Sequence, residues 1–178
     1  MKKNLIVVSK LMLLCFIVVM VSSCGNVSKK LVGTWEISDS GEKGVTIVRD
    51  MKEDGTFQDK IISETTEVEE GIVIQTNLII SINGKWDATS KFYAIEYDKE
   101  SAKIEKFELS FPSATEEEKA EYEEFLNIIT GSIKTEGLKE FTSEVPIGRQ
   151  QYFNLKVDDT QFSYLTEDGE ETWKKVEN

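Results

Sequence analysis

The residue types of this 178-residue chain exclude several kinds of chemistry. Histidine is absent, which removes histidine-based metal sites and histidine-dependent nucleophilic catalysis. Two cysteines are present, Cys15 and Cys24, together with 33 acidic residues. Of the two thiols, Cys24 has the surroundings that predict a reaction, because it ends an apolar run that passes through Ser22 and Ser23.

The first 23 residues have the three parts of a secretory signal peptide. Lys2, Lys3 and Lys10 supply positive charge, residues 11–21 are continuously apolar, and two serines lead to the cysteine. A membrane-spanning helix needs roughly 20 consecutive apolar residues. The apolar run here is about half that length, which is typical of a signal peptide. We therefore expect residues 1–23 to be removed.

The four residues Val21-Ser22-Ser23-Cys24 resemble the bacterial lipobox, in which an aliphatic residue and two small residues precede a cysteine. The resemblance implies diacylglycerol transfer to the Cys24 sulfur, cleavage before Cys24 and acylation of the freed amine, for example with palmitate. Lipidation adds about 0.8 kcal/mol of membrane affinity per buried CH₂, and two or more chains give a stable anchor. The alternative is an ordinary signal peptide in which Cys24 is incidental.

Cleavage would leave a strongly acidic chain without a disulfide. It removes three lysines and no acid, so that 18 basic residues remain against 33 acidic ones, a net charge of −15. Such a protein is unsuited to nucleic acid. Cys15 is lost with the signal and Cys24 is consumed by the lipid, so the fold must depend on its apolar core.

The remaining residue patterns do not indicate an enzyme, and we expect no cofactor, no metal and no catalytic residues. The sequence contains no calcium-loop spacing, glycine-rich phosphate loop or serine-centred elbow. Paired carboxylates could act as general acid and base. The acidic clusters nevertheless fall in a predicted turn and on a predicted helix face, where solvated surface is their ordinary role: 67, 69 and 70; 116–118; 121, 123 and 124.

Most of the chain after Leu31 has the alternating pattern of half-buried strands. Residues 71–84 place apolar side chains at even positions from Ile72 to Ile82, and residues 150–158 place Phe153, Leu155 and Val157 on one side. Hairpin dipeptides occur at Asp54-Gly55, Asn83-Gly84 and Asp168-Gly169. The pattern predicts nine or ten strands, near 33–38, 44–51, 56–63, 68–82 (divisible in two), 85–90, 92–98, 103–111, 150–157, 160–166 and 171–176.

One helix is predicted at about 114–130, within the stretch 112–131. Ser113 and Thr115 each precede a glutamate by three residues, which is a capping box. Apolar residues at helical spacing form a stripe that should lie against the sheet, and Gly131 suits the position after the last turn. Residues 132–149 are expected to form a loop with one short strand at 138–144.

The stretch Gly33-Thr34-Trp35 resembles the motif that opens the first strand of lipocalins, whose tryptophan plugs the closed end of a barrel. EDGTF (53–57), GKWDAT (84–89) and DGEETWKKV (168–176) resemble lipocalin-like domains of envelope lipoproteins. The resemblance implies an antiparallel β-barrel over 31–178, behind a lipidated tether at 24–30, with an open β-sandwich as the alternative. The inserted helix precedes the last two or three strands, unlike in lipocalins. Neither Arg49 nor Arg149 lies in the last strand, where many lipocalins carry an arginine, so Lys174 or Lys175 would substitute.

Two functions follow from these observations. One is an envelope lipoprotein, anchored in the outer membrane and facing the periplasm, that binds a small hydrophobic ligand without catalysis. The other is a filled module that contacts a second envelope protein. An eight-stranded barrel is either filled by side chains or holds one small ligand. Trp86, Tyr93, Tyr97 and Phe107 are the candidate lining residues or, alternatively, core, while Trp35 and Trp173 are expected to pack; no residue is assigned to a ligand.

Overall fold

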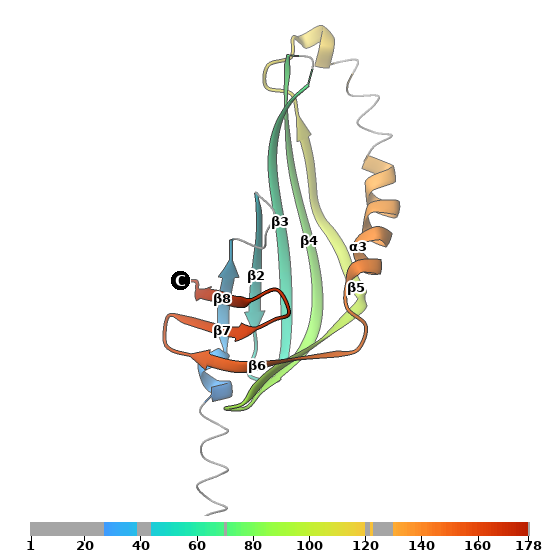
Figure 1. The fold of residues 1–178 in the computed structure, drawn as a ribbon. Helices are drawn as coiled ribbons and strands as arrows, with labels where there is room; N and C mark the ends of the chain where they lie inside the picture. Colours follow the sequence, from blue (N-terminus) through green and yellow to red (C-terminus); the bar gives the residue numbers. More distant parts are fainter. Residues whose placement is uncertain (1–26, 39–43, 70, 120–121, 123–129, 178) are drawn as a thin grey trace, which may run out of the picture.

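A computed structural model describes residues 27–38, 44–69, 71–119, 122 and 130–177, and over these the chain is mostly antiparallel sheet. Eight strands pair in sequence order and the last pairs with the first, which makes a closed ring (Figure 1). They are β1 (Gly33–Ile37), β2 (Val45–Met51), β3 (Thr56–Glu69), β4 (Ile72–Ala88), β5 (Phe92–Ser110), β6 (Arg149–Val157), β7 (Gln161–Leu165) and β8 (Glu170–Lys175). Two helical elements, the π-helix η1 (Ile133–Gly137) and α3 (Leu138–Glu144), lie between β5 and β6. The predicted antiparallel β class is confirmed.

Strand alternation sets the inside and the outside of the ring. Along β4 the even-numbered residues face inward, as predicted for 72–82, and the pattern continues to Trp86 and Ala88. Asn83, Lys85 and Asp87 alternate with them and are exposed. The inward residues of all eight strands form one core, which is rich in aromatic rings: Trp35, Phe57, Trp86, Tyr93, Phe162, Tyr164 and Trp173.

The ring closes around the first strand. Trp35 pairs with Lys175 across β1 and β8, and the Lys175 ammonium lies 5.3 Å from the centre of the Trp35 ring. Of the two lysines named from the sequence, Lys175 is the one that lies over the Trp35 ring. Residues 27–31 form a helical turn in which Leu31 is fully buried and accepts a 2.7 Å hydrogen bond from Trp35 Nε1. The first described residues, 27–31, therefore already contribute to the core.

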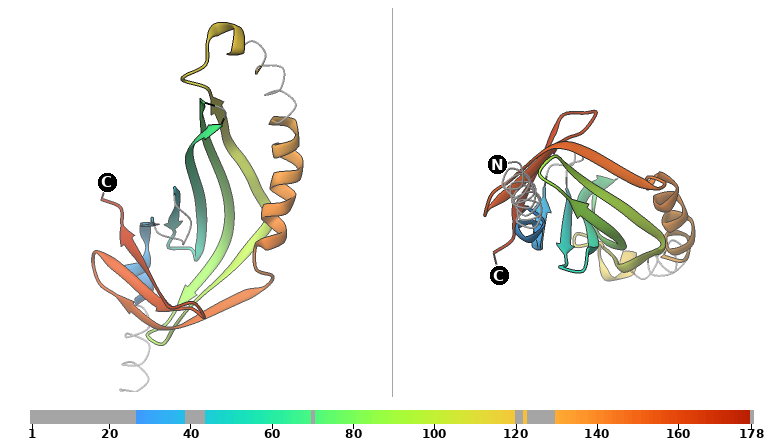
Figure 2. Two further views of the ribbon diagram at one scale, coloured as in Figure 1. Left: turned by 45° about the horizontal axis from the view of Figure 1, so that its top comes forward. Right: turned by 90° about the horizontal axis from the view of Figure 1, so that it is seen from below.

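Three strands extend well beyond the ring. β3, β4 and β5 have 14, 17 and 19 residues, whereas β2 reaches only Ser63 of β3 and β6 pairs only with residues 92–96 of β5. The upper parts of β3–β5 thus form a three-stranded extension, with α3 beside β5 (Figures 1 and 2). Lys99 Nζ donates a 2.8 Å hydrogen bond to the Thr142 carbonyl and links β5 to α3. The helix covers an edge of β5 that would otherwise be free to pair.

The number of strands predicted from the sequence was wrong because Asn83-Gly84 does not form a turn. Both residues lie inside β4, and the predicted strands 92–98 and 103–111 are likewise one strand, β5, with irregular pairing between them. Gly84 is needed for close packing. A Cβ at this position would lie 2.4 Å from the Phe57 ring and 2.6 Å from the Glu96 carbonyl oxygen. Turns do occur at Asp54-Gly55 and Asp168-Gly169, as predicted.

The helical region also differs from the prediction. Residues 116–119 are helical and the Thr115–Glu118 capping box is present, while most of the predicted stretch 114–130 lies outside the described residues. Residues 130–144 are helical, so Gly131 does not end the helix, and 138–144 is helix α3 rather than loop or strand. Half-buried Ile133, Leu138 and Phe141 recur at nearly helical spacing, and the π-turn accommodates Gly137 between them.

The alternation predicted for β6 holds only in part. Asn154 has φ 57°, and the pairing of β6 with β7 shifts between Phe153 and Lys156. This irregularity resets the alternation. Tyr152, Leu155 and Val157 consequently pack against the core, whereas Phe153 is exposed rather than sharing their side.

Candidate functional site

A buried ion pair lies at the centre of the ring interior. Arg49 of β2 and Asp59 of β3 are directly opposite one another in the strand register. Arg49 Nε donates to Asp59 Oδ1 at 2.7 Å and Nη2 donates to Oδ2 at 2.6 Å, and both side chains are only 2% exposed. This two-point geometry is the strongest that an arginine and a carboxylate can form.

Two tyrosines of β5 complete the hydrogen bonding of this pair. Arg49 Nη1 donates to the Tyr93 hydroxyl and Nη2 to the Tyr97 hydroxyl, each at 2.8 Å. The Tyr97 hydroxyl in turn donates to Asp59 Oδ2 at 3.1 Å. We refer to Arg49, Asp59, Tyr93 and Tyr97 as the buried Arg49 network. Buried charges are tolerated only when they are paired and hydrogen-bonded, as these are.

Aromatic rings enclose the guanidinium of the network. The Arg49 Cζ atom is 4.7 Å from the centre of the Phe57 ring and 4.5 Å from that of Trp173 in β8. Trp173 is itself fixed by its Nε1, which donates to Glu171 Oε1 at 2.7 Å. Strands β2, β3, β5 and β8 therefore all contribute to the surroundings of a single cation, and the cation–π contacts add to the ion pair.

Burial and charge shift the pKa values of the network away from neutrality. Burial alone lowers the pKa of the Arg49 guanidinium, but the facing Asp59, Tyr93 and Tyr97 raise this pKa well above its ordinary value. Burial raises the pKa of Tyr93 to about 12, although Arg49 opposes the rise, and raises the pKa of Tyr97 further. Groups with such values do not exchange protons near pH 7, so the network suits structural support rather than acid–base catalysis.

An apolar face continues upward from the network on the inner side of β3–β5. Above the pair of Asp59 and Ile82, each further row of inward side chains has one residue from β3, one from β4 and one from β5. We refer to them as the upper inner face, made of Ile61, Ile80 and Ile104; Ser63, Leu78 and Phe107; and Thr65, Thr76 and Leu109. Ile80 is buried and the apolar members above it are half-buried. This face is the described surface with the apolar character to receive a hydrophobic molecule.

The four residues predicted as lining candidates do not share one space. Trp86 and Tyr93 are buried in the core, and Trp86 Nε1 donates to the Thr56 carbonyl at 2.9 Å. Tyr93 and Tyr97 both belong to the buried Arg49 network, and of the four only Phe107 lies on the upper inner face. Trp35 and Trp173 are buried packing residues, as predicted. Cys24 lies outside the described residues.

Sequence reasoning missed Arg49 and Asp59, although a signal for them was present. Ile47, Arg49 and Met51 alternate along β2, and Phe57, Asp59 and Ile61 alternate along β3. A charged residue at an inward position between apolar ones indicates that its charge is buried and paired. A residue of opposite charge at an inward position of the next strand indicates the partner. The pattern could not show that two tyrosines of a third strand complete the pair.

A hollow of about 630 Å³ lies over the outer side of β3, β4 and β5. Its lining is of mixed charge and polarity: Lys52, Thr56, Phe57, Gln58, Asn83, Gly84, Lys85, Glu96, Tyr97 and Asp98. Within the described residues, no cluster of three or more acidic or cysteine side chains could hold a metal ion. In the same part of the chain, no helix is long and apolar enough to cross a membrane.

Comparison with protein-family models, with curated proteins and with solved structures gave no significant match.

The first prediction concerns the buried pair. Arg49→Met or Asp59→Leu alone leaves an unpaired buried charge and should lower the free energy of unfolding by about 3–5 kcal/mol, while the double variant recovers most of this loss. Urea unfolding of the four proteins measures the coupling. Arg149 and Asp87 form a similar pair at 2.6 Å that is about half exposed. Arg149→Met is therefore the control and should cost below about 1 kcal/mol. Equal costs for the two arginine variants would contradict the prediction.

The second prediction concerns alkaline pH. Because the pKa of Tyr93 is raised to about 12 in the folded protein and is about 10 in the unfolded chain, its contribution is complete below pH 10. It is lost as the pH rises toward 12, since the unfolded chain ionises first. Tyr93→Phe should flatten the fall of unfolding free energy in this range by up to about 1.4 kcal/mol per pH unit. Urea titrations between pH 9 and 12 that gave equal slopes for both proteins would refute this.

Proposed function

We propose that this protein is a lipid-anchored envelope protein whose lipocalin-like domain binds a small hydrophobic molecule on the upper inner face without catalysing a reaction. The anchor rests on the sequence around Cys24, and the localisation to the periplasmic side of an outer membrane rests on the same segment. The single observation that carries the binding proposal is the gradient of burial along the inner side of β4, from buried Ile82 to half-buried Leu78.

The side chains that fill the ring support a position for the proposed ligand. Its lower part is occupied by stacked rings, such as Phe162 against Trp173 at 5.8 Å between centres, and by the buried Arg49 network. A hydrophobic molecule would therefore rest above this floor, against Leu78, Ile104 and Phe107. In a lipocalin-like barrel the ligand enters from the open end, and here the long strands β3–β5 would form one wall of that end.

A second function has support from a different observation. The filled lower ring agrees with a solid module that has no ligand, and the mixed-charge hollow over β3–β5 is a surface of the kind that contacts another protein. In that case a second envelope protein, rather than a small molecule, is the partner. The two functions differ in whether the upper inner face takes up an apolar compound.

The third prediction tests binding with residues 25–178. An environment-sensitive fluorescent fatty acid should bind this domain, and native mass spectrometry should show extra mass that is lost on denaturation. Leu78→Gln should weaken probe binding at least tenfold, because it places an amide on the upper inner face. Ile79→Gln changes the adjacent half-buried residue on the opposite side and is the matched control. An unliganded mass together with no probe binding would favour the protein-interaction module.

The fourth prediction tests the anchor. Cells that produce the natural chain should incorporate labelled palmitate into it, and Cys24→Ser should accumulate as an unprocessed precursor without label. Cys15→Ser is the matched control, since it removes the other thiol and should leave processing intact. Cleavage of the Cys24→Ser chain, with no label in the natural protein, would show that the segment is an ordinary signal peptide.

A further inference from the structure

Three apolar side chains form a row across the outer side of β5, β6 and β7. Phe92 pairs with Phe153 in the register of β5 and β6, and Phe153 pairs with Leu165 in that of β6 and β7. We name these three residues the outer apolar row. Phe153 is 58% exposed and Leu165 is 45% exposed. Directly paired side chains on neighbouring strands are close enough to form a continuous patch.

The fold does not need this row for its own core. The inward neighbours Tyr93, Tyr152 and Tyr164 stack on one another, with centre distances of 4.6–6.3 Å between the Tyr152 ring and the other two. Phe153 points the other way because of the irregularity at Asn154. Exposed aromatic and aliphatic residues that gather on one patch, rather than occurring singly, indicate a contact surface.

The row begins at the end of the ring where the chain enters. Ser28 Oγ donates a 2.9 Å hydrogen bond to the Ala88 carbonyl, and Thr89 N donates to the Phe92 carbonyl at 2.9 Å across the β4–β5 turn. The N-terminal turn and Phe92 are thus at the same end, as the view from below also shows for residues 27–31 and the β4–β5 hairpin (Figure 2). Cys24 precedes Val27 by three residues, a reach of about 10 Å.

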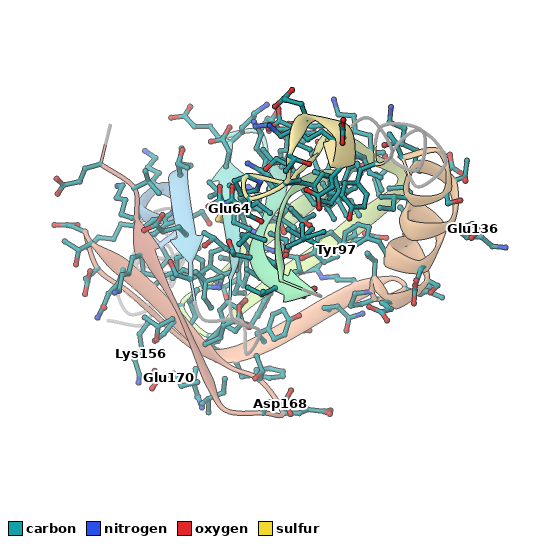
Figure 3. The ribbon with its side chains drawn as sticks, turned by 90° about the horizontal axis from the view of Figure 1, so that it is seen from above. Glu64, Tyr97, Glu136, Lys156, Asp168 and Glu170 are labelled. Atoms are coloured by element: carbon teal, nitrogen blue, oxygen red, sulfur yellow. The ribbon has the colours of Figure 1, made fainter. Side chains whose placement is uncertain are left out.

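Basic side chains accompany the row. Arg149 lies over the Phe92 ring with its Cζ 5.9 Å from the centre, and Lys91 directly precedes Phe92. Lys156 follows Phe153 by three positions on β6, is exposed, and pairs with Glu170 at 2.7 Å (Figure 3). Aromatic and aliphatic residues next to long cationic side chains suit the boundary between headgroups and acyl chains. Glu170 of β8 pairs directly with Leu165 in the register, so the outer apolar row ends there at an acidic residue.

We infer that the outer apolar row rests on the lipid surface to which the chain is anchored, so that the domain lies on the membrane in one orientation instead of turning freely on its tether. This inference rests on the proposed anchor at Cys24, and its partner is a lipid surface. The apolar contact adds to the affinity of the acyl chains. The upper ends of β3–β5 lie at the opposite end of the domain from the entry of the chain (Figure 1).

The fifth prediction uses the full acylated protein in vesicles of phosphatidylethanolamine and phosphatidylglycerol. With Cys15 removed and Cys24 acylated, Phe153→Cys or Leu165→Cys supplies the one thiol for a nitroxide label. Labels at 153 and 165 should collide several-fold more with oxygen relative to a water-soluble nickel chelate than a label at Val68→Cys. Val68 is 69% exposed and lies near the far end of β3, which makes it the matched control.

Three results would overturn the inference. Equal, water-like collision ratios at 153, 165 and 68 in vesicles would show that the row does not touch lipid. Shielding of the label at 153 already in lipid-free solution would show that a second copy covers the row. Absence of acyl mass on Cys24 would remove the proposed anchor as well, and mass spectrometry of the same sample distinguishes that failure from the other two.

Discussion

The buried pair of Arg49 and Asp59 is the interaction on which the rest of the ring depends. Two charges inside an apolar core are tolerated only if every strand that supplies a partner has the correct register, because a shift by one residue turns each side chain to the other face. β2 and β3 supply the charges, β5 the hydroxyls and β8 the ring of Trp173. The pair thus favours one arrangement of four strands over its alternatives, which is a matter of specificity more than of net stability.

This constraint divides the inner side of the domain into two parts. Below the Arg49 network, packed aromatic side chains fill the space enclosed by the eight strands. Above it β3, β4 and β5 pair only with one another, because β2 ends at Ser63 of β3 and β6 ends at Glu96 of β5. The inward residues of these strands change from buried to half-buried. The packed core does not depend on the upper inner face, so that loss of contacts on that face need not unfold the core.

Much of the fold could be predicted from the sequence, because alternation is a local property of each strand. The inward face of β4 followed directly from it, whereas the packing of Trp35 and Trp173 was expected from the motifs around these tryptophans. What failed was decided by distant residues. Asn83-Gly84 has the composition of a turn, but the glycine is required for a different reason. The ring of Phe57, 27 positions away in the sequence, fills the space that a side chain at position 84 would need. Asn154, with its positive φ, exposed Phe153 against the pattern. The candidate site was harder still to predict from the sequence, since the partners of Arg49 come from three other strands.

The pairing of β1 with β8 has a consequence for how the domain is assembled. Most other strands pair across short turns, so that these contacts can form early, and β5 pairs with β6 across residues 111–148. Trp35 can pair with Lys175 only when nearly the whole chain is present. Contacts between such distant residues form slowly, because a large loop must close first. A nascent chain that still lacks β8 has no strand to pair with the free edge of β1 and no Trp173 ring beside Arg49, so the core can be completed only after the last strand has been made.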